Sequence, residues 1–167
     1  MMQTKLPERK KNRLEGYDYS QNGAYFITIC TYGKEALLGK IVGDAAFGVP
    51  CVERTPIGEI VSQHIENITN QSGLRVEKYV VMPNHIHLLV WVETGNRTPK
   101  AASPTTAIIP RMVNALKGLS TKKYKNPLWQ RSYHDRIIRD EAEYLNTWQY
   151  IDENPAQWAE DVYYDHQ

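Results

Sequence analysis

The sequence predicts an α+β fold in which helices cover an antiparallel sheet, and three observations support this prediction. The apolar runs 24–32 and 85–92 are rich in β-branched and aromatic residues, which favour strands. Segment 57–70 carries apolar residues at helical spacing. Strand-like and helix-like segments follow one another as β-α-β-β-α-β-α, an order in which helices cross over between strands. The prediction is a ferredoxin-like β-α-β-β-α-β sandwich with an additional C-terminal helix.

The first half of the chain is predicted to contain most of the sheet. Its predicted elements are a strand at 24–32, a helix at 57–70, and strands at 74–82 and 85–92. Residues 1–22 form an irregular basic arm before them, so that a single domain spans 23–167. Glycines and Pro50 in 33–56 indicate a loop or a hairpin, to which the sequence assigns no function. Pro83-Asn84 marks a bend or a bulge between the second and third strands.

The second half is predicted to add a helix and the last strand. A polar linker at 93–105 is followed by a helix at 106–124 and by a fourth strand at 128–138. Pro110 lies near the start of that helix, where proline is tolerated because a first-turn N–H has no helical partner.

The final helix is predicted to follow directly. Asp140 is placed to cap its N-terminus, and Glu143 to complete a capping box. Apolar residues at helical spacing predict a buried stripe made of Tyr144, Leu145, Trp148 and Ile151. Pro155 is predicted to end the helix, since the residue before a proline avoids helical geometry.

The composition excludes several classes of protein. There is no run of about 18 apolar residues, so no transmembrane helix is expected. The N-terminal sequence lacks the apolar core of a signal peptide. Cys30 and Cys51 are the only cysteines, and their spacing indicates neither a zinc knuckle nor a disulfide framework. We therefore expect a bacterial cytoplasmic protein with reduced thiols and no membrane partner.

The net charge is only +1, but the charges are segregated along the chain. The arm 1–22 is basic, segment 111–139 contains Asp135 as its only acid, and segment 140–167 has no Lys or Arg. This segregation indicates a polyanion-binding face, although solvated helix faces produce the same pattern. Aromatic residues among the basic ones favour nucleic acid, because bases stack on aromatic rings. They are Tyr124, Trp129 and Tyr133.

His85 and His87 form a candidate metal site. Successive side chains alternate across a strand, so the two imidazoles share one face. Two imidazoles on one face can hold a metal ion, but histidines in strands also serve structural roles. Burial favours a functional role, because buried imidazoles without partners are costly.

Tyr150 and Asn154 lie four residues apart on the final helix and therefore share a face. That face is predicted to differ from the one formed by Leu145, Trp148 and Ile151. A tyrosine outside the core and an amide one turn away fit a nucleophile and a third metal ligand. An ordinary surface tyrosine and a C-terminal asparagine are the alternative.

Three segments now carry a family resemblance: 83–87 (PNHIH), 129–139 (WQRSYHDRIIR) and 150–155 (YIDENP). In this order and spacing they resemble the single-tyrosine transposases of the HUH superfamily, and most closely the REP-associated tyrosine transposases. The resemblance spans residues 20 to 158. It implies a DNA transposase, in which a ferredoxin-like sheet carries the HUH motif and a C-terminal helix carries the tyrosine.

The resemblance also implies the site and its chemistry. His85 and His87 match the paired metal ligands, and Tyr150 matches the catalytic tyrosine. Asn154 stands where related insertion-sequence enzymes have a glutamine ligand, with the same carbonyl oxygen on a shorter side chain. The implied cofactor is Mg²⁺ or Mn²⁺, of which Mn²⁺ suits imidazole better. The implied reaction is metal-dependent cleavage and rejoining of single-stranded DNA through a covalent 5′-phosphotyrosine.

The expected partner is single-stranded DNA with hairpin or palindromic structure. The candidate DNA-binding residues are Arg136, Arg139, His134, Lys122, Lys123 and Arg131. Salt bridges to the acidic C-terminal segment are the alternative for Arg136 and Arg139. The arm 1–22 is a candidate clamp for a hairpin, or else it is disordered.

Other functions stay open at the level of sequence. A catalytically silent hairpin-binding regulator would keep the basic residues without needing the site. A water-using nuclease would leave no covalent adduct, and the short chain argues against a replication initiator or relaxase. Related insertion-sequence enzymes are dimers that share active sites, whereas the resemblance to the REP-associated branch implies that a monomer can work alone. The short connection from Arg139 to Glu141 favours a site within one chain, in a monomer or a homodimer.

Overall fold

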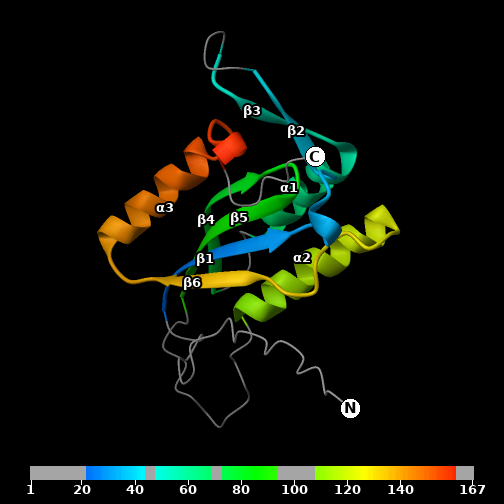
Figure 1. Cartoon of the computed structure of the whole chain (residues 1–167). Helices are drawn as coiled ribbons and strands as arrows, with labels where there is room; N and C mark the ends of the chain where they lie inside the picture. The colour runs from blue at the N-terminus through cyan, green and yellow to red at the C-terminus, as the bar shows by residue number, and fades with distance from the viewer. Residues whose placement is uncertain (1–21, 44–47, 69–72, 94–107, 161–167) are drawn as a thin grey trace, which may run out of the picture.

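A four-stranded antiparallel sheet in the order β4-β5-β1-β6 forms the centre of the protein (Figure 1). The computed structural model describes residues 22–43, 48–68, 73–93 and 108–160. The strands are β1 (Gly23–Cys30), β4 (Leu74–Val81), β5 (His85–Val92) and β6 (His134–Ile138). The two strands of each βαβ unit are separated by one strand position in the sheet. In the unit formed by β1, the first helix and β4, that position is occupied by β5. The predicted ferredoxin-like α+β class is confirmed.

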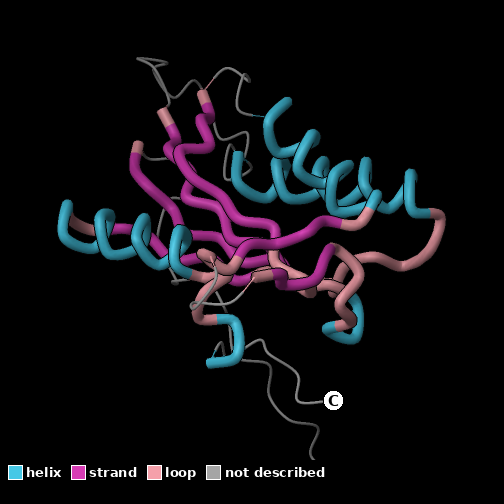
Figure 2. Tube along the Cα trace, turned by 90° about the horizontal axis from the view of Figure 1, so that it is seen from above, coloured by secondary structure: helices cyan, strands magenta, loops and turns pink. Residues whose placement is uncertain are grey.

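The helices form two layers, one on each face of the sheet (Figure 2). Helices α1 (Pro56–Ile68) and α2 (Ile108–Tyr124) pack against each other and cover one face. Helix α3 (Glu141–Glu153) lies on the opposite face, against β4 and β5. The predicted additional C-terminal helix is therefore present, and it covers the face opposite α1 and α2.

Strand alternation divides the core between these layers. In β5, Ile86, Leu88 and Val90 enter the main core with α1 and α2. Leu89 faces the other way and packs with Ile151 of α3 in a smaller cluster. Fully burying one such aliphatic side chain contributes about 1.5–3 kcal/mol, so both layers are held mainly by apolar contacts.

Segment 33–56 forms a hairpin, one of the two predicted alternatives. Strands β2 (Gly39–Val42) and β3 (Cys51–Arg54) pair as a separate antiparallel ribbon. A short 3-10 turn, η1 (Tyr32–Lys34), connects it to β1. Gly58 of α1 lies so close to the Leu38 carbonyl that any Cβ there would collide with it. The hairpin is thereby fixed against the start of α1.

Some predicted boundaries are wrong. The fourth strand begins at His134 rather than at 128, because Trp129 makes only an isolated bridge to Thr31 and the chain then leaves the sheet. Helix α1 ends at Ile68 within the described residues. Residues 1–21 of the predicted arm 1–22 lie outside the described residues. Nearly all of the predicted linker 93–105 lies outside them as well. Among the described helices, none has the length and apolar character needed to cross a membrane.

Helix α3 starts as predicted, with one difference. The Asp140 carboxylate accepts a hydrogen bond from the Glu143 backbone N–H at 2.8 Å, a cap that contributes about 1 kcal/mol. The Glu143 carboxylate reaches back to the N–H of Arg139, also at 2.8 Å, rather than to that of Asp140. The predicted capping box is therefore present in a form shifted by one residue.

The predicted stripe on α3 is partly wrong. Leu145 is 58% exposed, whereas Thr147 is buried and Ile151 is the main anchor on the sheet. Tyr144 and Trp148 pack beside Ile151, so three of the four predicted residues lie toward the sheet. Thr147 is accommodated inside because its hydroxyl donates to the Glu143 carbonyl oxygen at 2.7 Å. The buried face is therefore centred nearer to Tyr150 and Asn154 than expected.

Candidate active site

His85 and His87 project from β5 toward α3, and both are buried. Their Nε2 atoms lie 3.0 Å apart, so both ring nitrogens point to one place. Strand alternation produces this arrangement because Ile86, between them, enters the opposite core. The structure therefore brings the two histidines together on one face, in the arrangement that the sequence predicts.

Each histidine has a hydrogen-bond partner behind it. Nδ1 of His85 lies 2.8 Å from the side-chain oxygen of Asn84, whose amide nitrogen donates to the Lys34 carbonyl at 3.1 Å. An amide oxygen only accepts, so Nδ1 of His85 carries the hydrogen and its Nε2, beside Nε2 of His87, is an acceptor. Nδ1 of His87 lies 2.8 Å from the Thr28 hydroxyl. Such outer partners orient metal-binding histidines.

The environment keeps His87 neutral. Burial lowers the pKa of His87 well below its ordinary value, and the neighbouring His85 lowers it further. Neutral imidazole is the form that binds metal ions. Burial therefore holds His87 in the form that could bind a cation.

Tyr150 approaches the pair from α3. Its hydroxyl lies 3.4 Å from Nε2 of His87 in the same chain. The Phe26 ring lies edge-on to the tyrosine, with ring centroids 5.9 Å apart, and stacks on His87 at 5.0 Å. Packing of Ile151 and an ion pair between Asp152 and Lys78 of β4 hold this turn of α3 on the sheet.

Asn154 follows one turn later and is fully buried. It is bracketed by two residues that touch the pair: Tyr150 contacts His87, and the Trp158 ring stacks on His85 at 5.9 Å. Asn154 has helical dihedral angles, φ −55 and ψ −41, although Pro155 follows. The predicted avoidance of helical geometry is therefore wrong, since a further turn carries the chain over the histidines, with Gln157 N–H bonding the Glu153 carbonyl.

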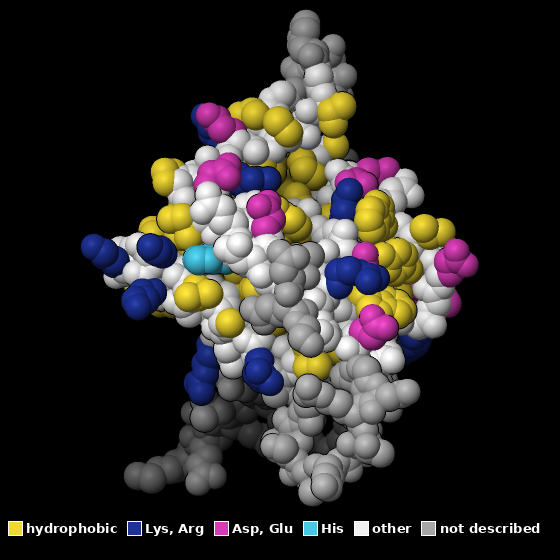
Figure 3. Space-filling model, turned by 180° about the vertical axis from the view of Figure 1, so that it is seen from behind, with side chains coloured by type: hydrophobic (Ala, Val, Ile, Leu, Met, Phe, Trp, Pro, Cys, Tyr) yellow, Lys and Arg dark blue, Asp and Glu magenta, His cyan; other side chains and the backbone are white. Residues whose placement is uncertain are grey.

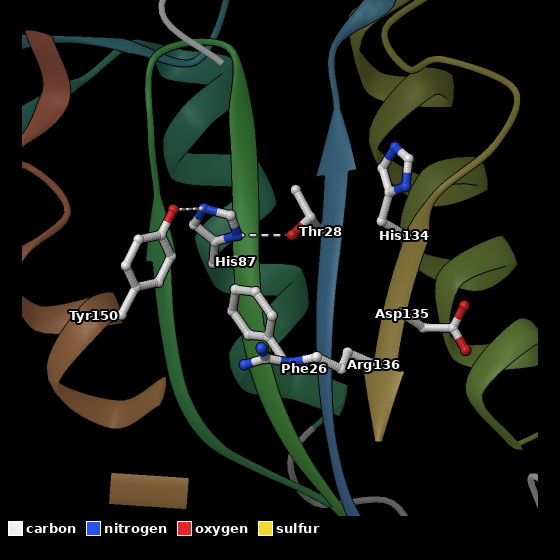
Figure 4. A pocket seen from close by; sticks show the side chains of 7 residues that line it. All are labelled: Phe26, Thr28, His87, His134, Asp135, Arg136 and Tyr150. Carbon is white, nitrogen blue, oxygen red and sulfur yellow. Dashed lines mark hydrogen bonds between the residues drawn. The ribbon is translucent and has the colours of Figure 1, made fainter. Parts of the chain in front are cut away.

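An open pocket of about 410 Å³ lies beside the pair (Figure 4). Its walls are formed by Phe26, Thr28, His87, His134, Asp135, Arg136 and Tyr150. Thr28 pairs with His87 on one side and with His134 on the other, so these three residues form one row across the sheet. Within the described residues, no group of three His, Cys, Asp or Glu side chains could hold a metal ion.

The candidate DNA-binding residues do not all gather at this pocket. His134 and Arg136 line it, and Arg136 also pairs with Glu143 at 3.4 Å and bonds the Thr147 hydroxyl. Arg139 lines a second hollow, at the N-terminus of α3. Lys122 and Lys123 are exposed at the end of α2, where basic side chains gather at one edge in Figure 3. Arg131 is exposed in the following loop.

Two residues of the basic, aromatic segment have internal roles instead. Trp129 is only 8% exposed and donates its indole N–H to the Ser120 hydroxyl at 2.8 Å. It cannot present a face to a base, so the prediction of a stacking role is wrong for Trp129. Lys117 donates to the carbonyl oxygens of Gln130 and Ser132, and burial lowers its pKa. Tyr124 and Tyr133 also pack partly against the core.

Sequence reasoning missed Thr28, Phe26 and Asn84 as parts of the site. Thr28 and Phe26 occupy alternate positions of a strand that looks like ordinary core. The sequence indicates only a bend or a bulge at Asn84. Its position directly before the histidine pair was the available signal.

Comparison with known proteins identifies the class. A family model described as "Transposase IS200 like" matches residues 50–154, and the chain belongs to this family of transposases. The protein is therefore a DNA transposase, a DNA-cleaving enzyme. A relative from Haemophilus influenzae, described as an uncharacterized protein, is 33% identical over 95% of this chain and 94% of its own length.

A solved structure shows the same fold. A REP-associated tyrosine transposase bound to a REP hairpin matches with a TM-score of 0.58 and 17% identity, over 92% of this chain and 74% of that one. A putative transposase from Deinococcus radiodurans R1 is 24% identical over 84% of this chain and 95% of its own, with a TM-score of 0.44. The first of these shares the α+β architecture described above.

Proposed function

We propose that this transposase cleaves and rejoins single-stranded DNA through a covalent bond between Tyr150 and a 5′-phosphate. One observation carries the proposal: the Tyr150 hydroxyl lies 3.4 Å from Nε2 of His87 in the same chain. A nucleophile is thereby positioned beside two converging imidazoles. The arrangement supports an active site formed within one chain, in a monomer or in each half of a homodimer.

The histidine pair fits a divalent cation. Two ligand nitrogens about 2.1 Å from one ion and about 90° apart lie about 3.0 Å from each other. The Nε2 atoms of His85 and His87 are separated by 3.0 Å. Asn154, buried one turn after Tyr150, supplies an amide oxygen as the proposed third ligand. Mg²⁺ and Mn²⁺ both accept oxygen donors, and the two imidazoles favour Mn²⁺.

The residues of the chain have separate roles in the proposed reaction. A bound cation would neutralise charge that develops on a non-bridging phosphate oxygen. Tyr150 attacks phosphorus in line and displaces the 3′-oxygen. Phe26 and His87 hold the phenol ring in place, which reduces the entropic cost of the attack. Because the phosphotyrosine preserves a phosphodiester, a 3′-hydroxyl can later attack it and rejoin the strand.

The proposed substrate is single-stranded DNA next to a hairpin. The structural neighbour bound to a REP hairpin supports this choice, and so do the exposed Lys122, Lys123 and Arg131. Arg136 and His134, in the pocket, are placed to contact phosphates near the cleaved bond, and Arg139 one further along. The arm 1–22 remains a candidate clamp for the hairpin. Location in the bacterial cytoplasm also remains a prediction from the sequence.

A cleavage assay tests the proposal. Hairpin-bearing single-stranded DNA is incubated with Mn²⁺ and wild-type protein, Tyr150→Phe or Tyr144→Phe. Tyr144 is a matched control, because it lies on the same helix but outside the pocket. We expect wild type and Tyr144→Phe to nick the DNA and Tyr150→Phe to be inactive. Equal nicking by all three proteins would disprove the assignment of the nucleophile.

The same assay separates the other functions. Hairpin binding without metal-dependent nicking by any protein would indicate a catalytically silent regulator. Nicking without a covalent protein–DNA species on a denaturing gel would indicate a nuclease that uses water.

A further inference from the structure

We propose that His134 is the general acid that protonates the leaving 3′-oxygen during cleavage. This inference rests on the proposed function, and it adds a catalytic residue that neither the metal site nor the nucleophile requires. The observation behind it is the position of His134 across the pocket from Tyr150 (Figure 4).

The sheet register fixes this position. His87, Thr28 and His134 are consecutive partners across β5, β1 and β6, and they lie on the same face. Side chains directly opposite one another on neighbouring strands have Cβ atoms about 5 Å apart, so His87 and His134 are about 10 Å apart at Cβ. That gap accommodates a phosphate group between them. Tyr150 lies on the His87 side of this gap, and His134 lies on the other side.

In-line displacement needs groups at both ends. The attacking and leaving oxygens lie on opposite sides of phosphorus. A phosphate above Thr28, attacked by Tyr150 from the side of His87, directs its 3′-oxygen toward β6. An alkoxide leaves poorly without a proton, and a positioned acid contributes about 10²–10⁴-fold to such a step.

The other β6 residues at the pocket do not fit this role. The guanidinium of Arg136 does not give up a proton in proteins, and here it is held by Glu143 and Thr147. Asp135 pairs with Ile27, whose side chain enters the opposite core, and its carboxylate points away from the pocket in Figure 4. His134 is exposed, so that it exchanges protons with water between turnovers. The ionisable residues that line the pocket with His134 are His87, Asp135, Arg136 and Tyr150.

The step balances as follows. The bond between the Tyr150 oxygen and phosphorus forms while the bond from phosphorus to the 3′-oxygen breaks. The phenol proton passes to solvent, and the proton on the His134 imidazolium passes to the 3′-oxygen, which leaves as a hydroxyl. In the rejoining step, neutral His134 accepts the proton of the attacking 3′-hydroxyl, and the tyrosine oxygen takes a proton from solvent.

The test replaces the leaving oxygen with sulfur. A 3′-S-phosphorothiolate at the cleaved bond releases a thiolate, which leaves without being protonated. Single-turnover cleavage is measured for wild type, His134→Gln, Arg136→Ala and Tyr150→Phe on the oxygen and sulfur substrates with Mn²⁺. Circular dichroism checks that each variant is folded.

We expect His134→Gln to lose about 100-fold on the oxygen substrate and to come within a few-fold of wild type on the sulfur substrate. Arg136→Ala is the matched control, since a phosphate contact slows both substrates to the same extent. Tyr150→Phe should be inactive on both. Equal losses on both substrates for His134→Gln, or no loss on either, would overturn the role of His134. Absence of cleavage by the wild type would overturn the proposed function itself.

Discussion

The side-chain oxygen of Asn84 lies 2.8 Å from Nδ1 of His85 and thereby determines which ring nitrogen faces the active site. The Asn84 backbone carbonyl is held in turn by the N–H and hydroxyl of Thr31, at 2.8 and 2.9 Å. A residue that the sequence places in a simple bend therefore connects the β4–β5 turn to the tautomer of a proposed metal ligand.

This contact predicts an effect on metal affinity. Asn84→Ala removes the acceptor for Nδ1–H, so His85 loses its fixed tautomer and orientation. We expect Mn²⁺ to bind about 10–100-fold more weakly, as is typical when an outer-shell partner is lost. Isothermal titration calorimetry of the folded variant measures the affinity. Asn84→Asp keeps an acceptor oxygen and should bind Mn²⁺ more tightly than Asn84→Ala; equal affinities for the two variants would contradict the account.

Two lysines on α2 are predicted to have different roles, one in stability and the other in DNA binding. Lys117 is held by backbone carbonyls of the 130–132 loop, which leads directly into β6. Lys117→Met keeps the aliphatic stem but leaves these acceptors without their charged donor, and should lower the free energy of unfolding by about 1–3 kcal/mol. Urea denaturation measures this loss. An unchanged midpoint would show that Lys117 does not anchor the loop.

Lys122→Met is the matched variant on the same helix. Its side chain is exposed, and we expect the free energy of unfolding to change by less than about 0.5 kcal/mol. Hairpin affinity should fall instead, and the slope of log affinity against log salt should decrease by about 1, the amount expected for one lost phosphate contact. Binding at several salt concentrations measures the slope, and an unchanged slope removes Lys122 from the DNA interface.

The corrected face of α3 predicts unequal costs of truncation. Ile151 is buried against Ala24 and Leu89, so Ile151→Ala should destabilise the protein by about 2–5 kcal/mol. Leu145 is exposed, and Leu145→Ala should change stability by less than about 0.5 kcal/mol. Thermal or urea unfolding compares them, and similar costs would support the stripe predicted from sequence instead.

A mixing experiment tests whether one chain supplies the whole site. Tyr150→Phe lacks the nucleophile and His87→Ala lacks a proposed ligand, so each alone should be inactive. Because Tyr150 reaches His87 of its own chain, we expect the mixture to stay inactive. Nicking restored by mixing would mean that α3 crosses to a partner chain.

The strands of this fold are more predictable than the details of the site. Alternation along β5 predicts that His85 and His87 share a face, because Ile86 and Leu88 have to enter the core. Helical periodicity also locates α3, but apolarity alone predicts that Leu145 is buried. Thr147 is buried in its place because its hydroxyl donates a hydrogen bond to a carbonyl oxygen of the preceding turn. A pattern of apolar residues does not reveal such a hydrogen bond.

Contacts between distant segments could not be predicted. Trp129 lies among basic residues and suggested base stacking, yet Ser120 of α2 supplies a partner for its indole N–H and allows burial. The row His87, Thr28 and His134 depends on the pairing of three strands that are far apart in sequence. Asn154 continues the helical path despite Pro155, because the next turn packs Trp158 on His85.

The identity of the covalent bond tests the central claim most directly. Wild-type protein is incubated with Mn²⁺ and a suicide hairpin substrate whose 5′-fragment, which carries the released 3′-hydroxyl, is too short to stay bound after cleavage. The trapped adduct is then digested and its cross-linked peptide is sequenced by mass spectrometry. We predict a 5′-phosphodeoxynucleotide on Tyr150, and its loss in Tyr150→Phe. A nicked substrate with no adduct, or with the nucleotide on another residue, would contradict the account.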